Sequence, residues 1–486
     1  MAISKGRRLF KADVGFKMNT LSFVQQVKKK EIDIVEHISK TIDELKKINK
    51  AYHYFNIISE EGALAQAREL RKNPKGKLAG IAVSVKDSIC VKGIESTAGS
   101  RILKGYRPLF DATAVEQAKK EGAIIVGKTS QDEFGFGGFS VNVGLDYEIP
   151  NNPFDASRSC GGSSGGAAGI TQKITIPHIA FGESTGGSIA CPASFCGVFG
   201  LCPTYGRVSR YGLIDFGNSL DKIGTLGKTA EDAALLLNVI SGYDKKDSTS
   251  LNVPVDDYLS YAGKSIKGMK IGVVKEAFGS ALDKGVEKHV RQGISNLESE
   301  GARCEDVSLP LSVKYGIPTY YLIGTSEAST NLAKLCGMRY GISEKLEGNF
   351  NEYFSKVRSK HFGEEAKRRI ILGTFARMVG YRDAFYLKAL KVRTRITEEY
   401  QKAFRKYDAL VSPTVPILPP KFSEIEKLSL LQTYMMDQLL VGPNLAGLPH
   451  LNVPVGFEKG LPVGMLLIGN HLQEGKLIQL GSKVEK

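Results

Sequence analysis

The sequence predicts an α/β protein with no clear internal division. A helix pattern at 112–122 (ATAVEQAKKEG) runs directly into an apolar strand pattern at 123–127 (AIIVG), the kind of αβ unit found in parallel sheets. The 486 residues show no repeat, no low-complexity tract and no linker, and 42% hydrophobic and 24% charged residues are typical of a globular protein. We therefore expect one large domain over 61–486, with an N-terminal helical segment over 1–60 packed against it.

Strand and helix patterns continue along the chain. An amphipathic helix is expected over 20–48, where branched apolar residues recur at helical spacing between lysines and glutamates. Apolar residues alternate over 81–85, which predicts a strand that ends at the charged pair Lys86–Asp87. The later patterns predict helices at 229–242 and 285–300, a largely helical stretch over 316–404, and strands at 267–274, 407–420 and 448–469.

One literal motif is interpreted as a coincidence. Residues 122–129 match GxxxxGKT, the pattern of a phosphate-binding loop. Such a loop needs a strand before its first glycine, whereas here the four intervening residues, AIIV, are themselves the predicted strand.

Composition limits the class of protein. The net charge is +15, which permits an acidic partner or nucleic acid, but the lysines are spread along amphipathic helices. No apolar run has the length of a transmembrane helix, and the start, MAISKGRRLF, lacks the apolar core of a signal peptide, so we expect a cytoplasmic protein without membrane contact. The seven cysteines include no CxxC pair, which argues against a disulfide framework or a zinc site, and no metal is expected.

Two glycine–serine clusters dominate the stretch 160–206. We call them the GGSSGG loop (161–166) and the STGGS loop (184–188). A flexible linker would be polar throughout, but apolar residues flank both clusters and the segment between them. Glycine-rich runs in such surroundings indicate close backbone approach, so we expect a buried site lined by main-chain groups.

Serine chemistry at these loops needs a base. His178 lies inside the apolar segment and is interpreted as structural. GxSxG occurs twice, centred on Ser163 and Ser164, but a nucleophile elbow requires an apolar strand before it, and PNNPFDASRSC is not one. The remaining candidate is Lys86, since a desolvated lysine at a strand end can act as a general base.

These segments together resemble the amidase signature family. The resemblance rests on GIAVSVKDSI, CGGSSGGAAG and GESTGGSIACPASFCGVFGLCPTYGRVSRYGL, and it is collinear from about residue 20 to 470. It implies a large mixed, mostly parallel β-sheet covered by helices on both faces. It also implies a Ser–cisSer–Lys triad with Ser188 as nucleophile, Ser163 as the bridging serine after a cis peptide bond, and Lys86 as base. The oxyanion hole would consist of backbone N–H groups of the STGGS loop: Thr185, Gly186, Gly187 and Ser188.

Within the family, the chain is similar to members that hydrolyse glutamine. TYYLIGTSEASTNLAKLCGMRYG, KRRIILGTFARMVGYRDAFYLKALKVRT and LVGPNLAGLPHLNVPVG carry this similarity. It implies that Arg369 pairs with the α-carboxylate of glutamine and Asp437, in YMMDQLL, with its α-ammonium, while Tyr320 lines the same pocket. Such a pair of opposite charges is what a free amino acid requires.

The sequence also departs from the family pattern around the triad. Ser184 stands where an aspartate is usual, Ala190–Cys191 replace an Arg–Gln pair, and Cys202 replaces a lysine. The spacing from Ser163 to Ser188 is one residue longer than usual, with the extra residue expected within ITQKIT. These changes remove no member of the triad.

The resemblance implies a glutaminase that supplies ammonia for the conversion of Glu-tRNA(Gln) to Gln-tRNA(Gln). It also implies a heterotrimer with B and C subunits, with ATP and Mg on the partner and tRNA bound mainly through it, while this chain needs no cofactor of its own. Two alternatives stay open. A stand-alone amidase would use the same triad on a small amide, and a non-catalytic nucleic-acid scaffold would rest only on the positive charge.

Overall fold

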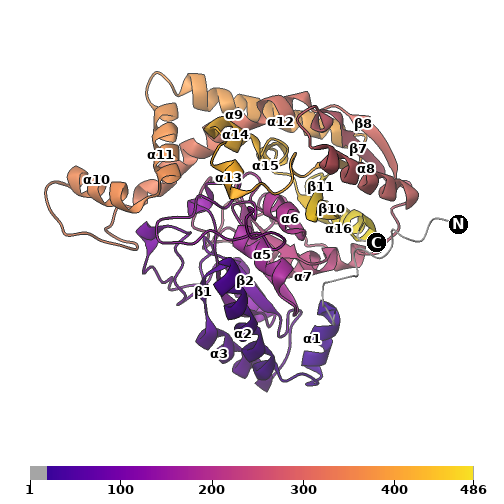
Figure 1. Ribbon diagram of the computed structural model, residues 1–486, viewed down its shortest axis with the longest axis horizontal. Helices are drawn as coiled ribbons and strands as arrows, with labels where there is room; N and C mark the ends of the chain where they lie inside the picture. Colours follow the sequence, from indigo (N-terminus) through magenta and orange to yellow (C-terminus); the bar gives the residue numbers. More distant parts are fainter. Residues whose placement is uncertain (1–18, 485–486) are drawn as a thin grey trace.

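The computed structural model describes residues 19–484 (Figure 1), so the basic start of the chain, used above for the predicted location, lies outside the described residues. Helices surround a central sheet, and helix α10 (Phe350–His361) projects from one side. Within residues 19–484, no helix combines the length and apolar character needed to cross a membrane.

One eleven-stranded sheet forms the centre of the described chain, in the order β1-β3-β2-β4-β6-β5-β10-β11-β9-β7-β8. The strands are β1 (Phe55–Ile58), β2 (Ala82–Lys86), β3 (Ile124–Thr129), β4 (His178–Ser184), β5 (Phe199–Cys202), β6 (Lys222–Gly227), β7 (Lys270–Val274), β8 (Arg303–Val307), β9 (Ala409–Pro413), β10 (His450–Glu458) and β11 (Leu461–Gly469). The predicted mixed α/β sheet is confirmed. The prediction that the sheet is mostly parallel was wrong, because six of the ten strand pairs are antiparallel and four are parallel.

A short connection accounts for one of the six antiparallel pairs. The antiparallel pair β10–β11 is joined by a tight turn at Lys459 and Gly460, which both have positive φ. Short turns of this kind join antiparallel strands, whereas parallel neighbours need long crossovers such as the α4-containing link between β2 and β3. Antiparallel pairs such as β1–β3 and β9–β11 also join strands that helices separate, so the proportion of antiparallel pairs follows from long-range strand pairing.

The helices are α1 (Thr20–Lys28), α2 (Ile34–Tyr52), α3 (Glu60–Lys72), α4 (Thr113–Lys120), α5 (Gly165–Lys173), α6 (Ala190–Cys196), α7 (Ala230–Ile240), α8 (Lys284–Ser299), α9 (Pro310–Asn331), α10 (Phe350–His361), α11 (Glu364–Arg377), α12 (Lys388–Phe404), α13 (Phe422–Ile425), α14 (Leu430–Met435), α15 (Val441–Leu445) and α16 (Glu474–Val484). The helix expected over 20–48 is two helices. Lys30 adopts a positive φ between them, and the Asp33 side chain then caps the start of α2.

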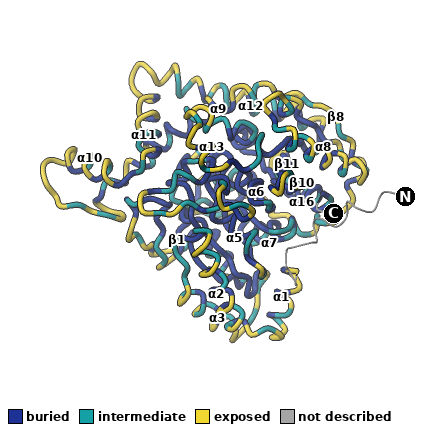
Figure 2. The backbone as a smooth tube through the Cα atoms, viewed as in Figure 1, coloured by how far each residue is buried: buried dark blue, intermediate teal, exposed yellow. Residues whose placement is uncertain are grey.

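Helices cover both faces of the sheet. Successive residues of a strand point to opposite faces, and on β11 Met465 and Leu467 join one buried apolar cluster while Leu466 and Ile468 join another. The first cluster includes residues of α1 to α4, α7, α8 and α16, and the second includes residues of α9, α11, α12 and α15. Figure 2 shows the buried backbone concentrated between these two layers.

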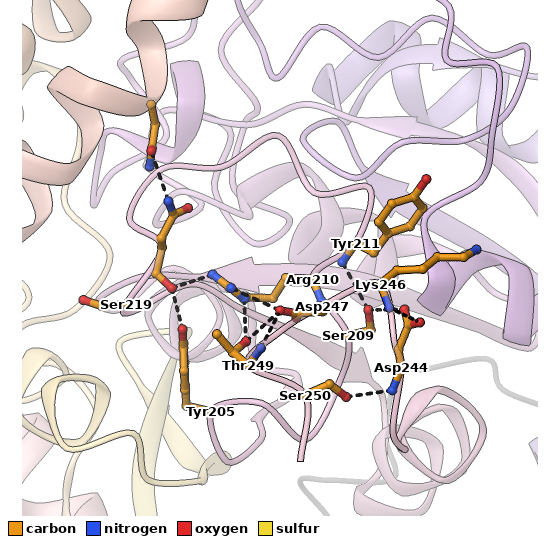
Figure 3. Close-up of polar contacts among 12 residues, drawn as sticks. Tyr205, Ser209, Arg210, Tyr211, Ser219, Asp244, Lys246, Asp247, Thr249 and Ser250 are labelled. Atoms are coloured by element: carbon orange, nitrogen blue, oxygen red, sulfur yellow. Dashed lines mark hydrogen bonds and ion pairs between the residues drawn. The ribbon is translucent and has the colours of Figure 1, made fainter. Parts of the chain in front are cut away.

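Polar contacts fix the connection between β5 and β6, which passes next to the serine loops. Arg210 bonds the Asp247 side chain and the Asn218 carbonyl, and Ser209 donates to Asp244 at 2.6 Å (Figure 3). The turn at 244–250 therefore anchors the connection shortly before it reaches Asp221 and β6.

Candidate active site

Lys86 is the last residue of β2 and is completely buried between β3 and β4. Its Nζ lies 2.7 Å from Ser163 Oγ, 2.9 Å from the Glu183 carbonyl oxygen and 2.8 Å from Glu183 Oε2. A central strand positions it, because the β2 backbone is paired on both sides. The sequence prediction of a desolvated lysine at a strand end agrees with this placement.

The GGSSGG loop brings Ser163 to this lysine. The peptide bond between Gly162 and Ser163 is cis, and Gly161 has φ +72°. The loop then enters α5 at Gly165, where close packing excludes side chains: a Cβ at Gly166 would lie 2.5 Å from the Tyr54 carbonyl oxygen. Glycine is required here because neighbouring backbone occupies the space of a side chain.

The STGGS loop lies beside the first loop and ends at Ser188. The Ser164 amide donates to the Ser188 carbonyl at 3.1 Å, which joins the two loops, and Ser188 is 6% exposed. Within residues 19–484, no acceptor takes the amide hydrogens of Gly186, Gly187 or Ser188. Unpaired buried amides on consecutive residues are suited to binding a developing oxyanion.

Tyr320 and Asp437 pack directly on the STGGS loop. A Cβ at Gly186 would lie 2.8 Å from the Tyr320 ring, and one at Gly187 would lie 2.4 Å from Asp437 Oδ1. Asp437 Oδ1 is buried and has no hydrogen-bond partner in the described chain. Burial raises the pKa of Asp437 to about 7, although the Arg369 charge opposes this shift. The ionised form of this buried carboxyl can pair with a cationic group.

Arg369 lies on α11 and is 2% exposed. Its Nε donates to Glu365 Oε1 at 2.8 Å. Aromatic rings surround the guanidinium within 6 Å, which favours a planar cation; they belong to Phe136, Phe216, Tyr321 and Tyr434. Phe216 also meets Tyr320 edge-on at 6.5 Å, so the arginine and the STGGS loop share one aromatic wall.

His178 is structural, as its apolar surroundings in the sequence indicate. It begins β4, and its ring nitrogens face Ser84 Oγ at 3.1 Å and Thr171 Oγ1 at 3.5 Å. Burial lowers the pKa of His178 to about 3, so its ring is neutral. The GxxxxGKT match is a coincidence, since 124–129 form β3.

The departures from the family pattern occupy buried positions. Ser184 Oγ donates to the Gly186 carbonyl at 3.4 Å, and Cys191 Sγ lies 3.3 Å from the Gly138 carbonyl oxygen. Ala190 joins the apolar cluster on the α9 side of the sheet. Burial raises the pKa of Cys202, whose Sγ lies 3.9 Å from Asn444 Oδ1.

Sequence reasoning missed the acidic side of the site. Glu183 immediately precedes the STGGS loop, and its two carboxylate oxygens contact Lys86 and Thr185. Asp221, at the entry to β6, also contacts Thr185. The alternation of β4 could have placed Glu183 on the Lys86 side, but no spacing signal connects Asp221 with it. Within residues 19–484, no three His, Cys, Asp or Glu side chains are grouped as metal ligands.

A family model described as Amidase matches residues 36–478. The chain belongs to the amidase signature family. The match covers both serine loops, Lys86 and the late strands, so the family resemblance drawn from the motifs is confirmed.

Individual family members share most of the chain's length. The A subunit of the glutamyl-tRNA(Gln) amidotransferase of Microcystis aeruginosa is 45% identical over 469 residues, covering 95% of this chain and 96% of the relative. The crystal structure of the corresponding A subunit from Thermotoga maritima superposes with a TM-score of 0.79 at 36% identity, covering 96% of this chain and 94% of that chain. A bacterial aryl acylamidase gives a TM-score of 0.83 at 24% identity over 98% and 96%, a likeness in fold alone.

Proposed function

We propose that this chain is the A subunit of a glutamyl-tRNA(Gln) amidotransferase, a glutaminase that supplies ammonia for the amidation of Glu-tRNA(Gln). The observation that carries the proposal is the buried contact of Lys86 Nζ with Ser163 Oγ at 2.7 Å, in a loop hydrogen-bonded to Ser188. The amidotransferase relatives, which match nearly the whole chain, support this choice within the family.

The arrangement performs amide hydrolysis in two steps. Ser188 Oγ attacks the side-chain amide carbon of glutamine while its proton passes through Ser163 to Lys86. The amide hydrogens of Thr185, Gly186, Gly187 and Ser188 stabilise the oxyanion. Lys86 returns the proton through Ser163 to the leaving nitrogen, ammonia departs, and water then hydrolyses the glutamyl ester.

Arg369 and Asp437 give the site its preference for a free amino acid. The guanidinium is held among aromatic rings and uses Nε on Glu365, so its terminal nitrogens can bind an α-carboxylate. Asp437 Oδ1 lacks a partner within residues 19–484 and can accept the α-ammonium. Tyr320 packs on Gly186 of the STGGS loop, and in this proposal it lines the same pocket.

The proposal includes partners and a location. We place the chain in the cytoplasm in a heterotrimer with B and C subunits, where the partner holds ATP, Mg and most of the tRNA. A domain division into a packed N-terminal segment (1–60) and one amidase domain (61–486) stays a prediction.

The test is glutamine hydrolysis by the full chain, alone and with its partner subunits, ATP, Mg and Glu-tRNA(Gln). Glutamate release that requires the partners and is abolished in Ser188→Ala supports the proposal. Ser194→Ala, on α6, is the matched control and retains activity. Efficient hydrolysis of simple amides by the chain alone, unchanged in Arg369→Ala and Asp437→Ala, would identify a stand-alone amidase instead.

A further inference from the structure

Glu183 supplies two of the three contacts of the buried lysine. Its carbonyl oxygen lies 2.9 Å and its Oε2 2.8 Å from Lys86 Nζ, while Ser163 Oγ lies at 2.7 Å. Both Lys86 and Glu183 are at most 3% exposed, so water does not compete for these contacts. The lysine nitrogen thus has three partners, one for each of the three tetrahedral positions that its bond to Cε leaves.

The chemistry of the partners decides how a neutral lysine is oriented. An amine has two N–H donors and one lone pair. A carbonyl oxygen and an ionised carboxylate can only accept, so both N–H groups must point to Glu183. Only Ser163 can donate, and the lone pair must therefore face Ser163 Oγ. Glu183 removes the other rotational choices of the amine.

A second carboxyl lies behind the first. Thr185 Oγ1 is 2.9 Å from Glu183 Oε1 and 2.7 Å from Asp221 Oδ1. A hydroxyl has one proton, so it donates to only one carboxyl, and the other contact requires a proton on the second carboxyl. Burial, together with the Glu183 charge, raises the pKa of Asp221 well above its usual range. Asp221 therefore holds that proton and donates to Thr185, which donates to Glu183.

We propose that Glu183 is a positioning residue for the general base: its carboxylate and its carbonyl oxygen hold the two N–H groups of the amine and aim the Lys86 lone pair at Ser163. A carboxylate 2.8 Å away favours the ammonium over the amine. Glu183 thereby orients the amine and supplies the negative charge next to it. This role rests on the proposed use of Lys86 as a base.

Other titratable groups lie near the pair: Asp132 is near Lys86, and Cys202 and Tyr320 are near Glu183, while Lys222 lies next to Cys202. Burial raises the pKa of Tyr320 and of Cys202, so both are neutral near pH 7. Burial lowers the pKa of Lys222 and raises that of Asp132 to about 6. Asp132 therefore titrates within the pH range of the experiment below. Because every variant keeps Asp132, its effect on the pH profile cancels when a variant is compared with the parent.

The test measures how fast a fluorophosphonate ester labels Ser188 in the full chain between pH 5 and 10. In this reaction Ser188 Oγ bonds to phosphorus, fluoride leaves, and the serine proton passes through Ser163 to Lys86. Labelling needs no glutamine, so it separates this inference from the proposed substrate: loss of glutamine hydrolysis with intact, pH-dependent labelling refutes only the latter. Ser188→Ala gives the blank.

Glu183→Gln keeps an acceptor for Lys86 and removes the charge. The rate of labelling is expected to rise with pH along an acidic limb and then level off at a plateau. We expect the acidic limb of Glu183→Gln to lie at lower pH than that of the parent by at least about one unit, and its plateau rate to stay within about tenfold of the parent. Glu183→Ala loses the orientation, and we expect its plateau to fall at least about tenfold below that of Glu183→Gln. An unshifted limb in Glu183→Gln, or equal plateaus in the two variants, overturns the proposal.

Asp221→Asn tests the proton on the second carboxyl. An asparagine can donate to Thr185 as the protonated acid does, so its labelling profile stays within about 0.3 pH units of the parent. A limb shifted to lower pH means that Asp221 is ionised and overturns the arrangement, and this variant decides the matter if Glu183→Gln fails to fold. Glu474→Gln, a buried carboxyl that caps the Thr204 amide, is the control and leaves the profile unchanged.

Discussion

Replacing Asp437 by asparagine tests whether this buried carboxyl binds an α-ammonium. The side chain is 7% exposed, its Oδ1 has no partner in the described chain, and burial raises its pKa to about 7. Before substrate binds, the carboxyl is thus half protonated at pH 7, but only the ionised form can pair with a cation. Glutamine binding must therefore strengthen as pH rises through 7.

The magnitude follows from the ionised fraction. With a pKa of about 7, about one-tenth of the molecules are competent at pH 6 and about nine-tenths at pH 8, so KM falls about tenfold, or about 1.4 kcal/mol. Asparagine does not ionise, so the variant shows no such change. It also loses a hydrogen bond to a charged group, worth about 1.5–3 kcal/mol, which raises KM at pH 8 by about ten- to a hundredfold.

The assay is glutamate release by the complex with its partners, with KM determined at pH 6, 7 and 8. Glutaramate, which is glutamine without the α-amino group, provides the matched substrate: the parent strongly prefers glutamine, and Asp437→Asn loses most of that preference. Asp232→Asn is the control, because Asp232 is an equally buried acid that caps α7 away from the site. A parental KM and pH dependence in Asp437→Asn would refute the assignment.

Three further changes test other parts of the structure. Gly187→Ala places a Cβ 2.4 Å from Asp437 Oδ1 and 2.6 Å from Leu440 Cδ1, so kcat/KM for glutamine falls at least about a hundredfold while the far-UV circular dichroism spectrum stays unchanged. Burial raises the pKa of Glu133 to about 7 from 4.5. Because the folded state binds this proton more tightly than the unfolded state, the free energy of unfolding falls by about 3 kcal/mol as pH rises from 4.5 to 7.5. Urea denaturation of Glu133→Gln is expected to show no such decline. Leu467→Ala removes a fully buried β11 side chain and lowers the urea-derived free energy of unfolding by about 2–5 kcal/mol; a loss under 1 kcal/mol would contradict its place in the core.

Local patterns were sufficient to predict β2, which carries Lys86, and to single out the two serine loops, but not the elements α5, β4 and α6 that flank these loops. Lys86 was recognised because apolar alternation predicts where β2 ends, and a strand end is a local property. The glycine loops were recognised because glycine among apolar residues signals backbone crowding, which Gly166 illustrates at 2.5 Å from the Tyr54 carbonyl. These features depend on neighbours in sequence or on a single close approach.

The remainder depends on long-range pairing. Glu183 and Asp221 meet at Thr185 because β4 and β6 pair antiparallel, with Glu183 opposite Ile223. Neither carboxyl belongs to a periodic or spaced motif, so nothing in the chain connects them before the strands pair. The same holds for the rings around Arg369, which come from segments far apart in sequence. The sheet was wrongly predicted to be mostly parallel for the same reason, since the direction of each pair depends on strands that lie far apart in the sequence.

Charge balance explains where protons reside in this site. Buried carboxyls outnumber buried cations around the serine loops: the carboxyls are those of Asp132, Glu183, Asp221, Glu365 and Asp437, and the cations are Lys86, Lys222 and Arg369. A poorly solvated interior cannot hold that excess of negative charge, so some acids keep protons. Burial, and after it the neighbouring Glu183 charge, raises the pKa of Asp221 well above its usual range, which favours the protonated form. Within residues 19–484, Asp437 Oδ1 has no polar partner, and in the proposed function the α-ammonium of glutamine replaces the proton of this carboxyl. A zwitterion adds no net charge, yet it satisfies Asp437 and Arg369 together, which an apolar amide cannot do. The proposed function therefore assigns the selectivity of the site to the α-carbon end of the substrate, and the reaction at the amide to the groups around Lys86.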